Sequence, residues 1–187
     1  MKFLTLFSEN PGCWTALPDS VGLPTDRPLY LPDFPDGAAL IPMAALRICR
    51  LGKCIEARFA DRYVDAVAPA IQLLPRGDAE EALIGEAPAS SAACFDCAIV
   101  SGIFRKYNPA SPPECSFLID DHPLHSAPLD PQRAARAIEI LSLCNTLKTG
   151  DVILLPQAPP TPVSQGQHLS AHGPNEPDEI LLRVRFK

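Results

Sequence analysis

Seven cysteines are the residues of this sequence best suited to bind a soft metal ion or to carry out thiol chemistry. Cys94 and Cys97 form a C-x-x-C pair, and four residues separate Cys49 from Cys54. A zinc site needs four such ligands that converge from tight turns. Cys49 instead falls in an apolar segment, and a free cysteine often packs as a small buried hydrophobic residue. Both pairs are therefore predicted to be core thiols, with a cysteine-based zinc or redox module as the alternative.

Histidine and serine are the other residues that could do chemistry. The four histidines, His122, His125, His168 and His172, could suggest a metal site, and the first two lie beside the two carboxylates of residues 120–121, in a predicted surface turn. A spacing of three residues in a turn does not by itself aim two imidazole rings at one ion. Ser20 and Ser101 lack the G-x-S-x-G sequence that presents a nucleophilic serine between a strand and a helix. Neither group predicts a catalytic centre.

The composition excludes several classes of function. The 187 residues carry 16 Lys and Arg against 22 Asp and Glu, for a net charge of −6, and contain no basic block that could follow a phosphate backbone. We expect no nucleic-acid partner. The apolar run at the N-terminus is too short for a membrane span or a signal-peptide core. An odd number of cysteines without a secretion signal favours reduced thiols, so a cytoplasmic protein is expected, with no membrane contact.

The hydrophobic pattern predicts the elements that would position any site. It indicates strands at 2–7, 29–31, 38–51, 67–74, 152–155 and 180–186, and a hairpin of 117–119 with 124–126. It indicates helices at 54–66, 78–84 and 131–144, the last with Asp130 as N-cap and Pro131 at its first position. With 22 prolines, much of the backbone is predicted to be turn or extended loop. The sequence therefore predicts one β-rich α+β domain over 1–187.

Three segments carry a family resemblance. Residues 18–34 read PDSVGLPTDRPLYLPDF, residues 46–65 read LRICRLGKCIEARFADRYVD, and residues 146–153 read TLKTGDVI. In this order and spacing they resemble the fumarylacetoacetate hydrolase (FAH) family in its single-domain bacterial form, here as a degenerate and shortened member. The resemblance implies a twisted mixed β-roll with two or three short helices. It also implies a homodimer, for which 47% hydrophobic residues provide material.

The resemblance also implies a metal site, which this sequence lacks. Members of the family hold Mg²⁺ or Mn²⁺ with a Glu-x-Glu on one strand and an Asp on the next. Residues i and i+2 of a strand point to one face, so two such carboxylates converge on one ion. The matching positions here are Ile41, Met43 and Gln72. We therefore expect no metal or other cofactor, and we expect Ile41 and Met43 to share one face and be buried.

Two functional hypotheses follow from the resemblance. The first is a catalytically inactive pseudoenzyme with a binding or structural role, in which Ser20, Arg76 and Asp96 are the residual pocket and no small-molecule ligand is identified. The second is an active hydrolase, decarboxylase or tautomerase that acts on a small acylpyruvate or 2-oxo acid. That enzyme would hold its divalent metal through other carboxylates, and the candidates are Asp19, Asp33, Asp65 and Asp96. Fold resemblance cannot choose between them, because function depends on the site.

Overall fold

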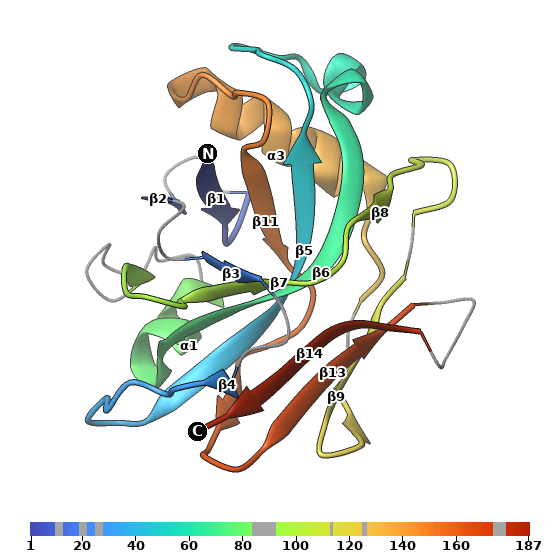
Figure 1. Ribbon diagram of the computed structural model, residues 1–187. Coiled ribbons are helices and arrows are strands. Elements are labelled where there is room, and N and C mark those ends of the chain that lie inside the picture. The colour runs from blue at the N-terminus through green and yellow to red at the C-terminus, as the bar shows by residue number, and fades with distance from the viewer. Residues whose placement is uncertain are drawn as a thin grey trace.

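Two β-sheets and a few helices make up the part of the chain that the computed structural model describes, which is residues 1–9, 13–18, 22–24, 28–83, 93–112, 114–124, 127–173 and 179–187. Figure 1 shows the larger sheet curving around one side of the molecule, with the smaller sheet crossing beside its lower part. Strands clearly outnumber helices among the described residues. The β-rich α+β class predicted from the sequence is confirmed.

The larger sheet has nine strands, in the order β2-β1-β11-β5-β6-β7-β3, with β12 also paired to β5 and β8 to β6. It is mixed, because β1 runs parallel to β11 and β3 runs parallel to β7. Its strands are β1 (Lys2–Leu6), β2 (Trp14–Pro18), β3 (Gly22–Pro24), β5 (Ala38–Ile48), β6 (Val64–Pro75), β7 (Ile99–Ser101), β8 (Arg105–Lys106), β11 (Val152–Pro156) and β12 (Thr161–Val163).

The smaller sheet has five strands, in the order β10-β9-β13-β14-β4. They are β4 (Pro28–Leu29), β9 (Ser116–Ile119), β10 (His122–Pro123), β13 (His168–His172) and β14 (Ile180–Phe186). The helices are α1 (Arg76–Leu83), α3 (Pro131–Cys144) and the 3₁₀ helix η2 (Ala57–Tyr63). Within the described residues this agrees with the two or three short helices implied by the resemblance.

The long strands β5 and β6 form the centre of the fold, and nearly all their residues are buried. Such continuous apolar sequence is expected where both faces of a strand are covered. Each strand contains a proline, which cannot donate a ladder hydrogen bond. Pro42 lies where β5 changes partner from β12 to β11, and Pro69 lies where β6 changes partner from β8 to β7. The two positions without a backbone N–H donor thus lie where one neighbouring strand ends and the next begins.

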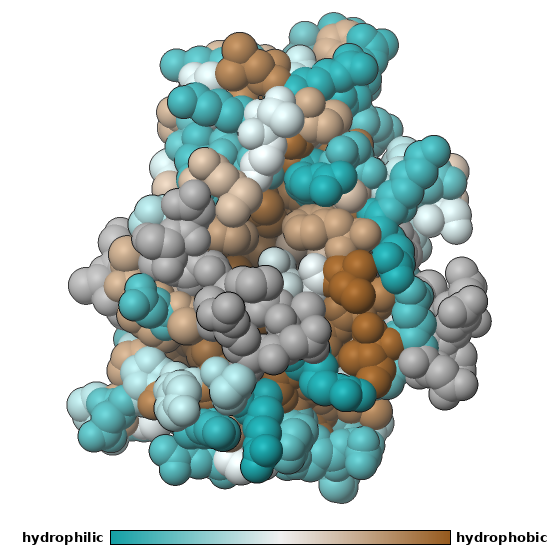
Figure 2. Space-filling view, in the orientation of Figure 1, coloured by the Kyte–Doolittle hydropathy of each residue, from teal (hydrophilic) through white to brown (hydrophobic). Residues whose placement is uncertain are grey.

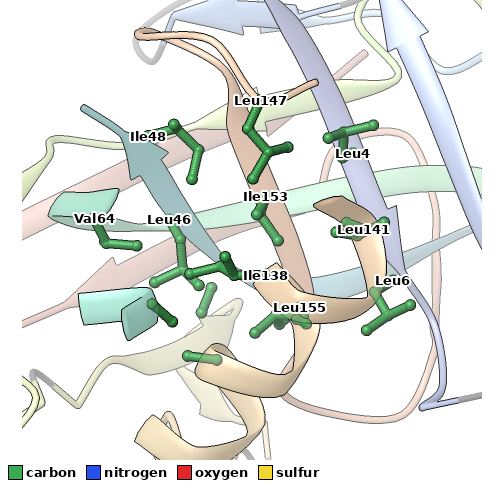
Figure 3. Close-up of a cluster of buried hydrophobic side chains, with 14 of the residues drawn as sticks. Leu4, Leu6, Leu46, Ile48, Val64, Ile138, Leu141, Leu147, Ile153 and Leu155 are labelled. Carbon is green, nitrogen blue, oxygen red and sulfur yellow. The ribbon is translucent and has the colours of Figure 1, made fainter. Parts of the chain in front are cut away.

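Helix α3 covers one face of the larger sheet, and its boundaries match the prediction. The Asp130 carboxylate caps the N-terminus by accepting a 2.9 Å hydrogen bond from the backbone N–H of Gln132, and Pro131 opens the first turn. Figure 3 shows the apolar contact that results, with side chains from the helix facing those of β1, β5 and β11. The contact includes Leu4, Leu6, Leu46, Ile48, Ile138, Leu141, Ile153 and Leu155.

Burial on two sides fixes how the sheets stack. At the start of β5 and the end of β6, one face packs against the inner face of the smaller sheet. This cluster includes Leu40, Ile71, Leu73, Leu169, Leu182 and Val184. The opposite face of β5 and β6 packs against β1, β2 and β11 in a separate cluster. Each face of the central strands therefore has its own partners.

The TLKTGDVI segment forms a buried structural turn. Gly150 has a φ of +89°, a left-handed conformation that favours glycine. The Asp151 carboxylate is almost fully buried and accepts hydrogen bonds from the backbone N–H groups of Lys2 (3.0 Å) and Lys148 (2.9 Å). The Lys2 ammonium lies 3.3 Å from the same carboxylate. This resemblance motif thus joins the N-terminal strand to the start of β11.

Several predicted boundaries were wrong. The helix predicted at 54–66 is only the 3₁₀ helix Ala57–Tyr63, because the preceding residues are bound elsewhere. Gly52 forms a β-bridge with Leu147, and the backbone N–H of Cys54 donates to the Ser142 carbonyl. The same bridge ends β5 at Ile48, three residues before the predicted end. The predicted helix at 78–84 begins directly after β6, at Arg76.

The predicted hairpin is present, but its turn is shorter than predicted. The turn consists of Asp120 and Asp121 alone, both with positive φ, and β10 follows at once. Six short strands, β2, β3, β7, β8, β12 and β13, were not predicted. None of the described helices combines the length and the apolar character that a membrane crossing requires. The single domain over 1–187 stays a prediction.

Candidate functional site

The three positions matched to the family metal ligands lie next to one another on β5 and β6. Ile41 is paired directly with Gln72 in the antiparallel ladder, and Met43 is paired with Ala70. All three side chains have 0% of their surface exposed. Ile41 and Met43 belong to the same apolar cluster. The predicted burial and the predicted shared face of these two residues are therefore confirmed.

Gln72 is the polar member of this group, and its amide is already engaged. Its Oε1 accepts a 2.8 Å hydrogen bond from the hydroxyl of Thr5, which is also fully buried. Among the described residues its Nε2 has no hydrogen-bond partner. Thr15 lies opposite Thr5 in the β1–β2 ladder, and its buried hydroxyl likewise has no partner among the described residues. A small buried polar cluster thus interrupts this apolar face.

These residues do not fit a hard divalent cation. Mg²⁺ is held at octahedral geometry by oxygen ligands, with carboxylates that offset its loss of hydration. Ile41 offers no donor, the thioether of Met43 is a soft ligand, and the Gln72 oxygen accepts from Thr5. Unpaired negative charge would also be costly in this apolar cluster. These three side chains instead form part of a buried apolar face that contains one amide group.

The carboxylates considered as substitute ligands lie at the surface where they are described. Asp33, Asp65 and Asp96 are exposed, and Asp19 lies outside the described residues. In the described part of the chain, no group of three or more His, Cys, Asp or Glu residues is placed to hold a metal ion. The structure therefore gives no support to a divalent site built from Asp33, Asp65 and Asp96.

Asp65 has a structural partner in the neighbouring motif. The Arg47 guanidinium makes two 2.9 Å hydrogen bonds to the Asp65 carboxylate, across the β5–β6 ladder. The pair is about half exposed. Hydrogen bonding to Arg47 lowers the pKa of Asp65, and the same bond raises the pKa of Arg47. LRICR and RYVD are thus connected by a surface ion pair.

The proposed residual pocket is described only in part. Arg76 is exposed at the start of α1, with Glu80 as its ion-pair partner at 3.8 Å, and Asp96 is exposed as well. Ser20 lies outside the described residues. Neither Arg76 nor Asp96 is among the described residues that line the groove on β13, the small cavity beside Met43 or the surface hollow beside α3. The grouping of Ser20, Arg76 and Asp96 stays a prediction.

The cysteine pairs are less buried than predicted. Cys54 and Cys94 are exposed, and Cys49 and Cys97 are half-buried, so the core-thiol prediction is wrong for the first two. For Cys54 the reason is that β5 ends at Ile48, which places residues 49–54 in a surface turn. Burial, followed by the charge of Asp96, raises the pKa of Cys97. A raised pKa opposes the thiolate that redox chemistry needs.

Two of the histidine and serine candidates, His122 and Ser101, lie at a surface turn and at the end of a strand. His122 is exposed, with Nδ1 2.8 Å from the Asp120 carbonyl oxygen, which agrees with the predicted surface turn. His125 lies outside the described residues. Ser101 is half-buried at the end of β7. The next residue is Gly102, where any side chain would clash, because a Cβ atom would lie 2.3 Å from the Leu181 carbonyl oxygen. Close backbone packing therefore accounts for Gly102.

Two sets of polar residues were not found from the sequence. Thr5 is one, although its place between Phe3 and Phe7 on an alternating strand marks a polar residue on an apolar face. The other is Ser170, which lies between His168 and His172 in β13 and shares their face, since Leu169 and Ala171 alternate with these polar residues. Period-two alternation was the available signal.

Solved structures of FAH-family proteins share this fold. One is described as a fumarylacetoacetate hydrolase family protein from Yersinia pestis CO92, with a TM-score of 0.77 and 17% identity over 100% of this chain and 92% of that chain. Fumarylpyruvate hydrolase from Pseudomonas aeruginosa, solved with Mn²⁺ and pyruvate, has a TM-score of 0.76 and 15% identity, over 100% of this chain and 90% of that chain. The 5-carboxymethyl-2-hydroxymuconate delta-isomerase from Mycobacterium smegmatis has a TM-score of 0.76 and 16% identity, over 99% of this chain and 78% of that chain.

These matches define the class of the protein at the level of the fold. No protein-family model and no curated protein sequence matches the chain. At 15–17% identity the structural matches show a shared fold and no shared activity. The chain has an FAH-like fold, as its three motifs predicted.

Proposed function

We propose that this chain is a relative of the FAH-family enzymes that is catalytically inactive at the family metal site and keeps the scaffold for a binding or structural role. The observation that carries the proposal is the state of positions 41, 43 and 72. They lie together on paired strands, they are fully buried, and they provide a single neutral oxygen that already accepts from Thr5. A metal site of the family type has no ligands there.

The consequence for activity follows from charge. The Pseudomonas aeruginosa enzyme was solved with Mn²⁺ and pyruvate. In such sites a metal ion stabilises negative charge on a substrate oxygen by several kcal/mol, and about 1.4 kcal/mol is worth a tenfold change in rate. Ile41, Met43 and Gln72 carry no charge that could replace this contribution. We therefore propose that the chain does not cleave or decarboxylate 2-oxo acids.

Metal binding and turnover test the proposal directly. The protein is incubated with millimolar Mn²⁺ or with a chelator, and both the unfolding temperature and the loss of acylpyruvate or oxaloacetate absorbance are followed. We expect neither to respond to the metal. Turnover that rises with Mn²⁺ and disappears with chelator would overturn the proposal and favour the active-enzyme hypothesis.

A restored variant tests whether these positions are the former ligands. Ile41→Glu, Met43→Glu and Gln72→Asp are combined and compared with an Ile41→Gln, Met43→Gln control, which is equally polar but lacks carboxylates. Mn²⁺ at 100 times its Kd stabilises a protein by about 2.7 kcal/mol, or roughly 5–10 °C for a chain of this length. We expect that rise only in the restored variant. Equal responses of the two variants would show that the matched positions are wrong.

We propose in addition that two copies of the chain associate. Figure 2 shows an apolar patch right of centre on one face, between hydrophilic upper and lower edges. Tyr30, Leu51 and Leu143 also expose more than half of their surface. A contiguous apolar patch such as the one in Figure 2 is typical of interfaces. Light scattering should return about twice the 20.2 kDa chain mass, and a monomer mass at high micromolar concentration would contradict the dimer.

A reducing, cytoplasmic location completes the proposal. All seven cysteines are free thiols, at depths that range from the buried Cys13 to the exposed Cys144. Free exposed thiols persist in reducing compartments. Mass spectrometry after alkylation in cell lysate should find all seven in the reduced form, whereas a native disulfide would contradict this location.

A further inference from the structure

A polar groove lies on the smaller sheet, apart from the buried positions on β5 and β6. Leu169 and Ala171 of β13 point into the core between the sheets, so His168, Ser170 and His172 point to the outer face. The groove has a volume of about 430 Å³. That is within the range of small-molecule sites, roughly 300–1,000 Å³. Its position makes any activity there independent of the proposed loss of the metal site.

Ser170 and His172 form the chemically distinctive contact of this groove. The Ser170 Oγ lies 3.0 Å from the His172 Nε2. A hydroxyl becomes a useful nucleophile when a base within about 2.6–3.2 Å can take its proton. The i, i+2 spacing on a strand holds both side chains on the same face. The geometry therefore pairs a nucleophile with a base in a space that a small molecule can enter.

The neighbouring strand β14 supplies the remaining groups that an acyl substrate would need. Arg183 is paired directly with Ser170 in the ladder, and Ile180 is paired with His172. Both line the groove. Directly opposed residues on one face have Cβ atoms about 4.5–5.5 Å apart. A guanidinium at this place can stabilise negative charge on an acyl oxygen, and Ile180 provides an apolar surface for a short acyl chain.

We propose that this groove is a reactive site at which small carboxylic esters acylate Ser170. The Ser170 Oγ forms a bond to the acyl carbon while its proton passes to His172 Nε2. The bond between the acyl carbon and the leaving oxygen breaks, and the leaving alcohol takes that proton. Water then cleaves the acyl–serine bond, which releases the carboxylic acid and restores the serine hydroxyl.

A fluorophosphonate probe tests the nucleophile, because activated serine oxygen displaces its fluoride and leaves a stable bond to phosphorus. Labelling is followed by intact mass and located by peptide mapping. We expect one label, on Ser170, that Ser170→Ala abolishes. His172→Gln removes the base and should slow labelling by about 100-fold or more, since general bases contribute 10²–10⁴. Ser116→Ala is the matched control, because Ser116 is exposed and paired in register with His172.

Turnover of p-nitrophenyl acetate provides the second readout. The native protein should release a burst of nitrophenolate that Ser170→Ala lacks and Ser116→Ala retains. All three proteins should unfold at similar temperatures, because both serines lie outside the buried core. Absence of labelling, labelling that survives Ser170→Ala, or equal rates in native and His172→Gln proteins would each overturn the proposal.

Discussion

The hydrogen bond between Thr5 and Gln72 leads to a specific stability prediction. These two residues are 67 positions apart in the chain, are fully buried, and are joined by a 2.8 Å bond from Thr5 Oγ1 to Gln72 Oε1. We propose a double-mutant cycle with Thr5→Val, Gln72→Met and the combined variant. Valine keeps the shape of threonine, and methionine keeps the length of glutamine, so the changes remove polarity with little change in volume.

The magnitudes follow from which polar atoms each variant leaves unpaired. Thr5→Val leaves the whole Gln72 amide without a partner among the described residues, at a cost of about 1–3 kcal/mol. Gln72→Met leaves the buried Thr5 hydroxyl without its acceptor, at a similar cost, but it also removes the buried unpaired Nε2 of Gln72, so its net effect should be near zero. The double variant buries no polar group from the pair and should be as stable as the native protein. A coupling energy of about 1–3 kcal/mol results.

Urea or thermal unfolding measures the cycle. For a chain of this length 1 kcal/mol corresponds to roughly 2–4 °C, so Thr5→Val should lower the unfolding temperature by about 2–12 °C. Thr15→Val is the matched control: it removes a neighbouring buried hydroxyl that has no partner among the described residues, and should be neutral or stabilising. A neutral Thr5→Val variant, or a double variant whose loss equals the sum of the single losses, would refute the buried amide pair.

Three further predictions concern structural groups. Asp151→Asn should lower the free energy of unfolding by about 2–3 kcal/mol in urea titrations, because the carboxylate accepts two backbone N–H groups; a neutral result would contradict this role. The lowered pKa of Asp65 means that its pair with Arg47 stabilises fully above pH 3.8 and that this contribution is lost as pH falls through the lower folded value. Asp65→Asn should therefore lower the free energy of unfolding by less than about 1 kcal/mol at pH 7, because the pair is half exposed, and should have no effect in stronger acid. Urea titrations at the two pH values measure this difference. Finally, Cys54 should react with a thiol reagent in the native protein and Cys13 only after unfolding, as alkylation and peptide mapping would show.

The elements predicted well from the sequence are those whose signals are local. Helix α3 has an N-cap, a proline at its first position and a 3.6-residue apolar period within one segment, and its boundaries were predicted without error. Strand β14 was equally clear, with alternating burial in its second half. The start of helix η2 was predicted wrongly, because it depends on the bridge from Gly52 to Leu147, a contact between segments that are distant in the chain.

The candidate site was predictable only as a set of positions. The resemblance placed 41, 43 and 72 on adjacent strands, and the ladder indeed pairs Ile41 with Gln72. The partner of the Gln72 oxygen could not be predicted, because Thr5 lies on β1, which does not pair with β6. Its contact with Gln72 depends on the curvature of the sheet, which no periodicity in the sequence describes.

The two-sided burial of β5 explains how the scaffold would still fold after the proposed loss of its metal site. Leu40 and Leu46 lie on the face that packs against the smaller sheet and α3, and they set the register whatever occupies the other face. Ile41 and Met43 then add burial worth roughly 1.5–3 kcal/mol each on the face where metal ligands would be. Because neighbouring residues of a strand point to opposite faces, one face can be refilled with apolar side chains while the other keeps its contacts. On this reasoning the fold depends on the even-numbered residues of β5, and family chemistry would depend on the odd-numbered ones.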